Sequence, residues 1–381
     1  MQINLEDLAA KRAKSSLGLS ISDHTFDLAN FQEKELVITG KGTRGLVFKN
    51  AKYKTILFQD CVIDNAGTGV VIKIDGTTEY LNLIGSNCKL FGKAGNSQSQ
   101  MIYVVGTWSN VRIGGFEIDQ RRDNKTGSTV TGACVQLQGC KTGNLGTVDI
   151  FDLTIRNAGD EGVYVNHFER DTVYVEGKNL TLENIKVFGS GRDFLQEWGF
   201  DNVVIKNCYG ENGMKEADVN HMSACSINGD TESLLIEDCE FKNIAQLLYS
   251  GKPSSGKSIN ALIKNVNYDQ GVHAGSRSNS SVYAKGPGVY RFENCEILAP
   301  AVKIAAFSAD GCKIEVSKNC VVIAPNLFRD PFNGGSYDQI TPEPIVTKTV
   351  GEITIQTATT WDGKVTTQYF DSSGRELIYK P

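Results

Sequence analysis

Residues 203–208 read VVIKNC, residues 234–239 read LLIEDC and residues 290–295 read YRFENC. Each is an alternating apolar stretch that ends in Asn or Asp followed by Cys. The same word, ending in Cys or another apolar residue, is found elsewhere as ILFQDC (56–61), LIGSNC (83–88), LTIRNA (153–158), LTLENI (180–185), EFKNI (240–244), LIKNV (262–266) and VSKNC (316–320).

The Asn or Asp of this word recurs at a spacing typical of a solenoid. Most intervals between successive positions fall between 23 and 31 residues. The one long interval, from Asn87 to Asn157, has room for a turn near Val111–Phe116 and an inserted loop around Arg121–Thr131. The positions used for this spacing are Asp60, Asn87, Asn157, Asn184, Asn207, Asp238, Asn265, Asn294 and Asn319.

Short strands of period two at this spacing, separated by Gly, Asn, Asp and Ser corners, indicate a coil of stacked parallel strands. Equivalent residues of successive turns would lie about 4.8 Å apart. Asn or Asp at a corner tolerates the left-handed conformation and can form a side-chain ladder with its neighbours above and below. The Cys that follows is expected to point inward as a small hydrophobe. The sequence therefore predicts an all-β solenoid of about ten turns.

Composition agrees with this fold and excludes several classes of protein. The chain has 39 Gly but 8 Pro, and the first Pro is Pro253, which suits strands that need every backbone N–H for a ladder. A net charge of -5 argues against a protein that grips nucleic acid. No apolar window is long enough to predict a membrane-spanning helix, and the charged N-terminus does not resemble a secretory signal.

The ten cysteines predict a structural role. Six of them lie in the repeated word, and no CxxC pair or zinc-site spacing occurs in the chain. A stack of reduced thiols suggests assembly in a reducing compartment.

The corner words, together with RNAGDEGVYV (156–165) and GSGRDFLQEWGFDNVVIKNC (189–208), resemble the right-handed parallel β-helix of the pectin-lyase-like superfamily. That group includes polysaccharide lyases, glycoside hydrolases of the polygalacturonase type and bacteriophage tailspikes, and the chain looks most like a tailspike-type protein. The resemblance covers about residues 35–325 and lies in corner and core words. The motif sets of polygalacturonases and pectate lyases are absent as sets, so the resemblance implies a fold more than an activity.

The two ends of the chain differ from the coil. In residues 1–34, Leu5, Leu8, Ala9 and Leu17 predict a short amphipathic helix that either caps the coil or anchors the protein to a larger assembly.

After the coil, residues 326–346 are rich in Pro, Gly, Asn and Asp and are interpreted as a linker. Residues 347–381 contain EITIQTATTW (352–361), KVTTQYF (364–370) and RELIYKP (375–381), separated by Asp-Gly and Ser-Gly turns that indicate hairpins. This β module resembles the terminal modules that hold phage tail proteins as trimers. A simple C-terminal cap fits it equally well.

Six segments can be aligned as one strand per turn and would place polar side chains on one flank. We expect Glu161, Asp193, Asp218 and His221 to be catalytic. Arg192, Gln196, Trp198, Asn220 and His273 are expected to bind substrate. The aligned segments are DEGVYVNH (160–167), RDFLQEW (192–198), DVNHMSAC (218–225), AQLLYSG (245–251), GVHAGS (271–276) and AVKIAAF (301–307).

The spacing of the carboxylates limits the chemistry. Carboxylates one turn apart, such as Glu161 and Asp193, would lie roughly 5 Å apart, near the spacing in retaining glycosidases, and carboxylates two turns apart would suit an inverting pair. A lyase would instead need a base, such as His221 or Lys215, and neutralisation of the uronate by Arg192 or by Ca²⁺. We expect no other cofactor or metal.

Two properties of the flank leave its role open. Charged side chains there are also typical of a merely solvated face, and a slip of one residue in register would reverse every side chain. If Val163 and Val165 point inward, Tyr164 and Asn166 point outward, but this register is awkward for Glu197, which the alignment places on the flank.

These features predict a virion-associated bacteriophage protein, like a tailspike or tail fibre, that binds a bacterial surface polysaccharide along its flank. The residues leave open whether it also depolymerises that polysaccharide. Such a protein would be made in the host cytoplasm, form a homotrimer and contact other virion proteins through its N-terminus, without nucleic-acid or membrane partners. The alternatives are a stand-alone, extracellular polysaccharide lyase or glycoside hydrolase, and a structural decoration protein without a glycan site.

Overall fold

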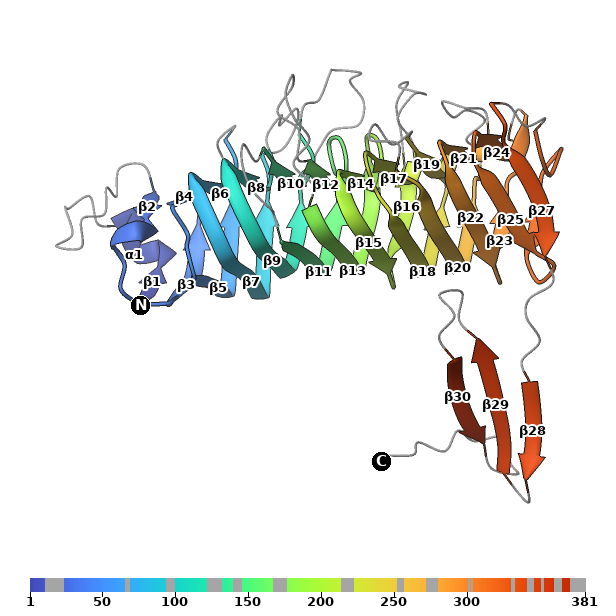
Figure 1. Cartoon of the computed structure of the whole chain (residues 1–381). Helices are drawn as coiled ribbons and strands as arrows, with labels where there is room; N and C mark the ends of the chain where they lie inside the picture. Colours follow the sequence, from blue (N-terminus) through green and yellow to red (C-terminus); the bar gives the residue numbers. More distant parts are fainter. Residues whose placement is uncertain are drawn as a thin grey trace.

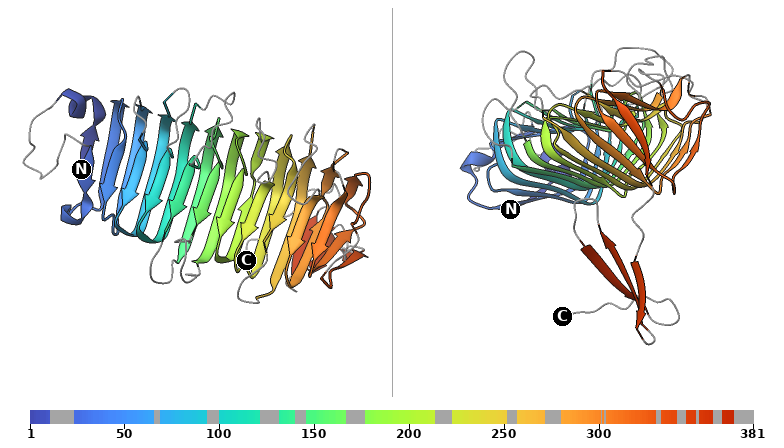
Figure 2. Two further views of the ribbon diagram at one scale, coloured as in Figure 1. Left: turned by 90° about the horizontal axis from the view of Figure 1, so that it is seen from above. Right: turned by 45° about the vertical axis from the view of Figure 1, so that its right-hand side comes forward.

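The chain folds as a right-handed parallel β-helix (Figures 1 and 2). The structure is a computed structural model. It describes residues 1–10, 24–65, 69–93, 100–121, 132–139, 146–166, 177–213, 223–251, 257–271, 280–300, 302, 304–329, 333–340, 346–350, 353–359 and 365–370.

The coil is built from two parallel sheets between which the chain alternates. The larger, sheet A, contains β1 (Gln2–Asn4), β3 (Glu35–Gly42), β5 (Thr55–Asp64), β7 (Thr77–Phe91), β9 (Thr107–Asp119), β11 (Thr147–Arg156), β13 (Gly177–Ser190), β15 (Phe200–Lys206), β16 (Tyr209–Gly213), β18 (Ser233–Lys242), β20 (Ile259–Asp269), β22 (Gly288–Glu293), β23 (Glu296–Leu298), β25 (Lys313–Ser317), β26 (Val321–Ile323) and β27 (Ser336–Ile340).

The smaller, sheet B, contains β2 (Thr25–Asp27), β4 (Leu46–Lys49), β6 (Ile72–Asp75), β8 (Ile102–Val105), β10 (Val135–Gln138), β12 (Val163–Asn166), β14 (Leu195–Trp198), β17 (Ser223–Asn228), β19 (Gln246–Ser250), β21 (Ser280–Lys285) and β24 (Ala305–Asp310).

Period-two alternation becomes continuous columns of side chains when the turns stack in register. Inward residues of sheet A form a fully buried apolar column, which removes apolar surface from water at every turn. This column contains Ile56, Leu83, Ile113, Ile150, Leu182, Ile205, Ile236, Ile263 and Phe292.

The corner expected from the repeated word is present, with one correction. Asp60, Asn87 and Asn265 adopt φ of 48°, 50° and 52°, in the left-handed region that Asn and Asp tolerate best. Their side chains form the expected ladders, with Asn87 donating to Asp60 at 2.7 Å and Asn265 donating to Asp238 at 2.9 Å.

Asn157 was wrongly placed in this corner. Asp152, with φ of 51°, is the residue in line with Asn184 and accepts a hydrogen bond from it at 2.6 Å. Asn157 belongs to a second corner, where it donates to Asp119 at 3.0 Å. Both residues follow an apolar stretch, and only the pairing with β13 distinguishes them.

The cysteines of the repeated word face the core, as predicted. Cys61 and Cys88 lie side by side in adjacent turns, and the backbone N–H of Cys208 donates to the sulfur of Cys239 at 3.4 Å. Nine of the ten cysteines fall within the described residues, all nine are free thiols, and eight of them are buried.

The sheets extend into both segments that were expected to flank the coil. In the segment expected as a cap or anchor, β1 pairs with β3, β2 pairs with β4, and the short helix α1 (Leu5–Ala10) lies between these strands in the chain. In the expected linker, β27 pairs with β25. The path through sheet A therefore has thirteen strands in the described part of the chain, where about ten turns were expected.

The C-terminal strands form a separate antiparallel sheet of β28 (Val346–Val350), β29 (Ile353–Thr359) and β30 (Val365–Phe370) (Figure 1). The expected hairpin between EITIQTATTW and KVTTQYF is present as the β29–β30 pair. Strand β28 was not expected, and residues 371–381 lie outside the described residues. No helix in the described part of the chain is long and apolar enough to cross a membrane.

Candidate functional site

Sheet B carries the flank on which the polar residues were expected, but three of the six aligned segments were displaced. Val163 pairs with Leu195, as the first two segments require, but Leu195 pairs with Cys225, at the very end of the third segment. The strand of the third turn is β17, at Ser223–Asn228, so it begins later than DVNHMSAC (218–225). The strands in place of GVHAGS (271–276) and AVKIAAF (301–307) are β21 and β24. The connections between the sheets vary in length, and the alignment had no signal for this.

The structure describes five of the nine expected site residues. Glu161, Arg192, Asp193, Gln196 and Trp198 lie at the start of β12 and β14 or within β14. Asp218, Asn220, His221 and His273 lie outside the described residues, as do His167, Lys215 and Lys303.

The outward side chains of sheet B form a row that we call the flank row. Each pairs with the next in register, so the row covers six strand spacings of about 4.8 Å, or about 29 Å. Four of its seven members are tyrosines and two are glutamines. The row consists of the partly exposed Tyr103, Tyr164, Tyr249 and Tyr283 and the buried Gln136, Gln196 and Ser226, which alternate in part with them.

A second row of outward side chains lies beside the flank row and forms hydrogen bonds with it. Asn166 donates to the Tyr164 hydroxyl at 2.6 Å, and Asn228 donates to Ser226 at 3.0 Å. Trp198 lies between Asn166 and Asn228 in this second row and is partly exposed. The indole therefore presents an apolar surface among amide and hydroxyl groups.

At the Tyr283 end of the flank row, two tyrosines and a lysine lie close together. The rings of Tyr249 and Tyr283 lie 5.9 Å apart, and the Lys285 ammonium lies 4.8 Å from the centre of the Tyr283 ring. The Tyr283 hydroxyl donates to Asp310 at 3.2 Å. Burial of the phenol and the charge of Asp310 raise the pKa of Tyr283 to about 12, so the hydroxyl stays protonated and remains a donor.

Two carboxylates and one guanidinium form a buried cluster at the corner before β12 and β14. The Arg192 side chain lies 3.2 Å from a carboxylate oxygen of Asp160 and 3.2 Å from one of Glu161. Glu161 is 3 % exposed and Asp160 is 8 % exposed. One arginine therefore contacts two carboxyl groups that are almost removed from water.

Gln196 connects this cluster to the exposed indole. Its amide satisfies both neighbours in one orientation, in which the nitrogen donates to Glu161 at 3.0 Å and the oxygen accepts from the Trp198 indole N–H at 3.2 Å. Asp193 is 1 % exposed and accepts the backbone N–H of Ser223 in the next turn. Asp193 thus holds a corner of the coil, whereas Glu161 is linked to the flank row.

The environment of Glu161 favours its protonated form. Burial, and then the charge of Asp160, raise the pKa of Glu161 well above its usual value, although Arg192 opposes the shift. A buried carboxylic acid next to a second carboxylate is the arrangement that a general acid requires near neutral pH. Burial of its phenol also raises the pKa of the adjacent Tyr164, so that its hydroxyl stays protonated.

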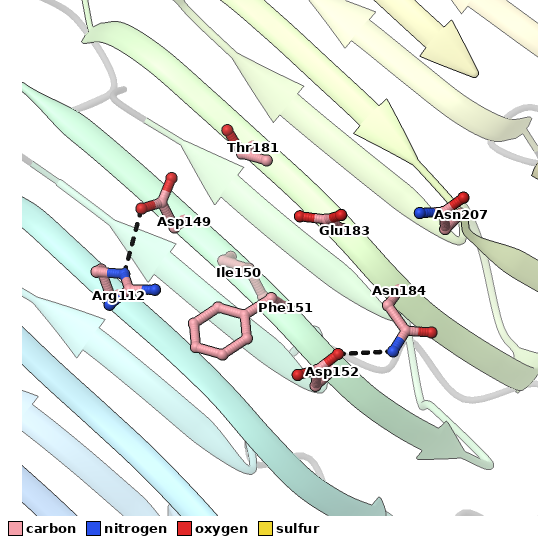
Figure 3. Close-up of a pocket in the computed structure, with 9 residues that line it drawn as sticks. All are labelled: Arg112, Asp149, Ile150, Phe151, Asp152, Thr181, Glu183, Asn184 and Asn207. Carbon is pink, nitrogen blue, oxygen red and sulfur yellow. Dashed lines mark hydrogen bonds and ion pairs between the residues drawn. The ribbon is translucent and has the colours of Figure 1, made fainter. Parts of the chain in front are cut away.

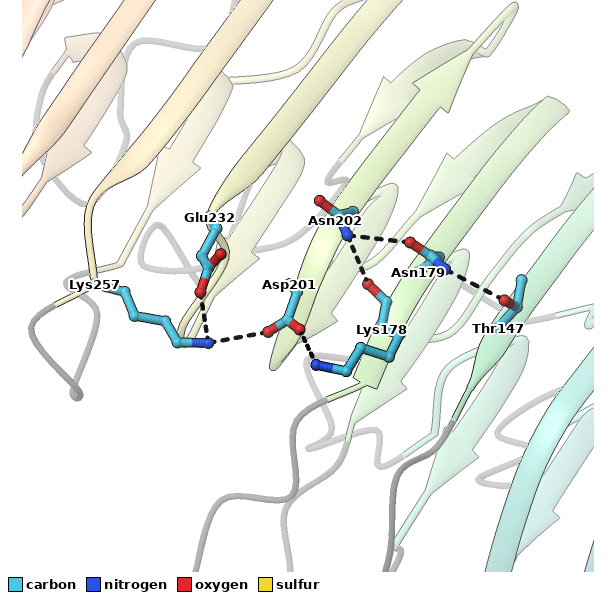
Figure 4. A network of polar contacts seen from close by, with 7 residues as sticks. All are labelled: Thr147, Lys178, Asn179, Asp201, Asn202, Glu232 and Lys257. Atoms are coloured by element: carbon cyan, nitrogen blue, oxygen red, sulfur yellow. Dashed lines mark hydrogen bonds and ion pairs between the residues drawn. The ribbon is translucent and has the colours of Figure 1, made fainter.

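A polar network fixes the corner that follows Trp198 (Figure 4). Asp201 accepts from Lys178 at 2.7 Å and from Lys257 at 3.0 Å, and Lys257 also pairs with Glu232 at 2.9 Å. Burial alone raises the pKa of Asp201, but the two lysines outweigh it and hold that pKa below its usual value. These contacts link the starts of β13, β15, β18 and β20, which are four successive turns, and so orient the end of β14.

Glu197 is a core residue, whereas the alignment of segments placed it on the flank with Gln196 and Trp198. It lies in the inward column of sheet B between Val165 and Ile227 and is 1 % exposed. Its carboxyl group accepts the backbone N–H of Asn228 at 3.0 Å and the Thr231 hydroxyl at 3.3 Å. These donors offset part of the cost of burial, which nevertheless raises the pKa of Glu197 to about 8.

Sequence reasoning did not select several residues that the structure places on this surface. Asp160, Tyr164, Asn166, Asn228 and Tyr283 were not chosen as site residues. A signal for Tyr164 and Asn166 existed, because they alternate with the inward Val163 and Val165.

Within the described ranges, no three His, Cys, Asp or Glu side chains converge in a way that would hold a metal ion. No protein-family model matches the chain, and a search among curated proteins finds no relative.

The buried Glu197 should make stability depend on pH. Its pKa of about 8 in the folded state lies above its ordinary value of 4.5, so the folded state holds the proton more tightly and stability falls as pH rises from about 5 to 9. In wild type, we expect the free energy of unfolding to fall by on the order of 3 kcal/mol across this range because of Glu197. Glu197→Gln should remove this fall, as measured by urea unfolding at each pH. The exposed Glu296→Gln is the control, and equal pH slopes in wild type and Glu197→Gln would contradict the assignment.

Proposed function

We propose that this protein binds a bacterial surface polysaccharide along sheet B. The single observation that carries the proposal is the flank row, in which hydroxyl, amide and aromatic groups repeat at one strand spacing over about 29 Å. An extended sugar chain needs this combination, because its hydroxyls require hydrogen-bonding partners and its apolar ring faces suit aromatic surfaces. The rigid coil holds these groups in place before the ligand arrives, which lowers the entropic cost of binding.

The polar groups of this surface suit a carbohydrate better than a protein partner. Gln196 and Asn228 are 7 % and 6 % exposed and already take part in side-chain hydrogen bonds. Tyr164 lies next to Gln196 and Trp198 lies next to Asn228 on the adjacent strands. Such small, ordered polar groups around aromatic edges favour individual sugar hydroxyls over a broad apolar contact.

A second function, cleavage of the bound polysaccharide, is favoured by the Glu161 cluster. A protonated Glu161 would donate a proton to the leaving oxygen of a glycosidic bond, and Arg192 would stabilise the carboxylate that remains. This role of Glu161 is that of a general acid in a glycoside hydrolase. It would be the same in a virion protein and in a stand-alone enzyme. In a lyase, Arg192 would instead neutralise the uronate.

The tailspike interpretation adds a virion location, contacts with other virion proteins through the N-terminal segment, and a homotrimer. It is supported by the coil and by the small C-terminal sheet. A sheet of three short strands is barely stable alone and therefore needs a surface to pack on. In a trimer, the copies of this sheet would provide that surface for one another. A structural decoration protein would share this architecture without binding a glycan.

Trp198→Ala should weaken polysaccharide binding about tenfold, because the mutation removes the exposed ring beside the flank row, an effect of about 1.4 kcal/mol. Binding is measured by calorimetry with purified O-antigen and capsular polysaccharides. Tyr53→Ala removes an aromatic ring at a distant corner, where Tyr53 is more exposed than Trp198 at 57 %, and should leave affinity unchanged. Equal losses in the two variants, or no binding by wild type across the panel, would argue against this surface.

Glu161→Gln tests the second function. We expect it to reduce cleavage at least about 100-fold while binding is retained, because the amide cannot donate the proton. Cleavage is followed by reducing ends and by the absorbance of unsaturated uronates, with Glu296→Gln as the matched loss of one exposed carboxylate. Full cleavage by Glu161→Gln, or no cleavage by wild type of a polysaccharide it binds, would rule out this role.

Light scattering tests the assembly. A homotrimer should have a mass three times the 41.5 kDa of the chain. A monomer at all protein concentrations would contradict the tailspike interpretation and favour the stand-alone enzyme.

A further inference from the structure

A second surface of the coil has the properties of a binding site and lies on sheet A. It is a depression of about 610 Å³ over β11, β13 and their neighbours (Figure 3). This volume lies within the range of small-ligand sites. Its lining includes Arg112, Asp149, Phe151, Glu183, Asn184 and Asn207.

Phe151 forms a flat apolar surface in the depression. The neighbouring residue on β9 is Gly114, and a Cβ atom there would come within 2.6 Å of the Phe151 ring. The ring therefore lies against the glycine backbone, and Figure 3 shows it nearly face-on. The Arg112 guanidinium carbon lies 5.1 Å from the ring centre, so it borders this surface on one side.

The charges around the ring are unequal. Arg112 pairs with Asp149 at 3.3 Å, and Asp152 accepts from Asn184 at 2.6 Å. With Glu183, the depression carries three carboxylates against one guanidinium, a net charge of about −2 at neutral pH. Acidic sugars are repelled by such a surface.

Glu183 is the carboxylate in the depression that has neither an ion-pair nor a hydrogen-bond partner among the described residues. It belongs to an outward column of sheet A in which Lys206, Glu237 and Lys264 follow one another in register. Both lysines pair with Glu237, at 3.4 and 2.5 Å. Glu183 is exposed, and its carboxylate forms no ion pair or hydrogen bond with any other residue that the structure describes.

We propose that this depression binds a hexosamine unit with a free amino group. The apolar face of the sugar would lie on Phe151, and its ammonium group would pair with Glu183. The Asn184 and Asn207 amides would bond its hydroxyls. A lysine side chain of a protein partner would match the charge alone, whereas a sugar ring matches both the charge and the flat ring. This site lies on a different sheet from the flank row and does not depend on the proposed function.

Calorimetry with a glucosamine hexamer and with the N-acetylated hexamer tests the proposal on the full chain. Wild type should bind the free amine at least about tenfold more tightly than the acetylated form, since acetylation removes the charge. Glu183→Gln should lose about tenfold in affinity for the glucosamine hexamer, and Phe151→Leu should weaken both hexamers. Glu293→Gln, in the same outward column four turns away, is the matched control and should bind as wild type does.

The outcomes separate this site from the flank row. Trp198→Ala should keep full affinity for the glucosamine hexamer, and thermal melting of each variant shows that it is folded. Equal affinity for both hexamers, or an equal loss in Glu183→Gln and Glu293→Gln, would overturn the proposal. If Trp198→Ala lost binding of the glucosamine hexamer and Glu183→Gln kept it, the hexamer would bind at sheet B. This result would also overturn the proposal. Binding of a polylysine peptide but neither hexamer would assign the depression to a protein partner.

Discussion

Hydrogen bonding between successive turns is the constraint on which the rest of the structure depends. Each turn of a parallel coil satisfies its backbone groups on the turns above and below, and therefore every turn must keep the register of its neighbours. This requirement explains the left-handed corners at residues such as Asn87 and Asn265, where the chain must change direction within one residue. It also explains the long region without proline, since proline lacks the N–H that the ladder needs.

The same register creates the surfaces from which we argue function. A side chain on one turn has neighbours at one strand spacing on either side, so a residue type that repeats becomes a row or a column. On sheet B this produces the flank row, which passes the buried pair of Glu161 and Arg192 near its middle, where Gln196 donates to Glu161. On sheet A, Glu237 forms ion pairs with Lys206 and Lys264 in an outward column of alternating charges. The carboxylate of Glu183, in the same column, forms no ion pair with the described residues.

Buried polar groups mark where the coil departs from a uniform apolar stack. Glu197 occupies a core position between Val165 and Ile227, and donors from the following corner accompany its carboxyl group inside the protein. Asp193 similarly holds the backbone of Ser223. Such groups stabilise irregular corners at the cost of desolvation, and they lie next to the candidate site. Around β14, the carboxyl groups of Asp193 and Glu197 therefore hold the fold, and they lie close to Glu161, which belongs to the candidate site.

The coil could be predicted from the amino-acid sequence alone, because the alternating strands, the left-handed corners and the inward cysteines depend on local conformation and on side-chain size. It also predicted that Trp198 and Gln196 would share a flank, but it placed Glu197 there too, whereas Glu197 faces the core beside Val165. Only the tertiary structure decided that Asp152 and not Asn157 aligns with Asn184, where β17 and β21 begin, and that Arg192 bridges Asp160 and Glu161. These features depend on register between turns, which is set by packing between residues distant in the chain and by connections of unequal length.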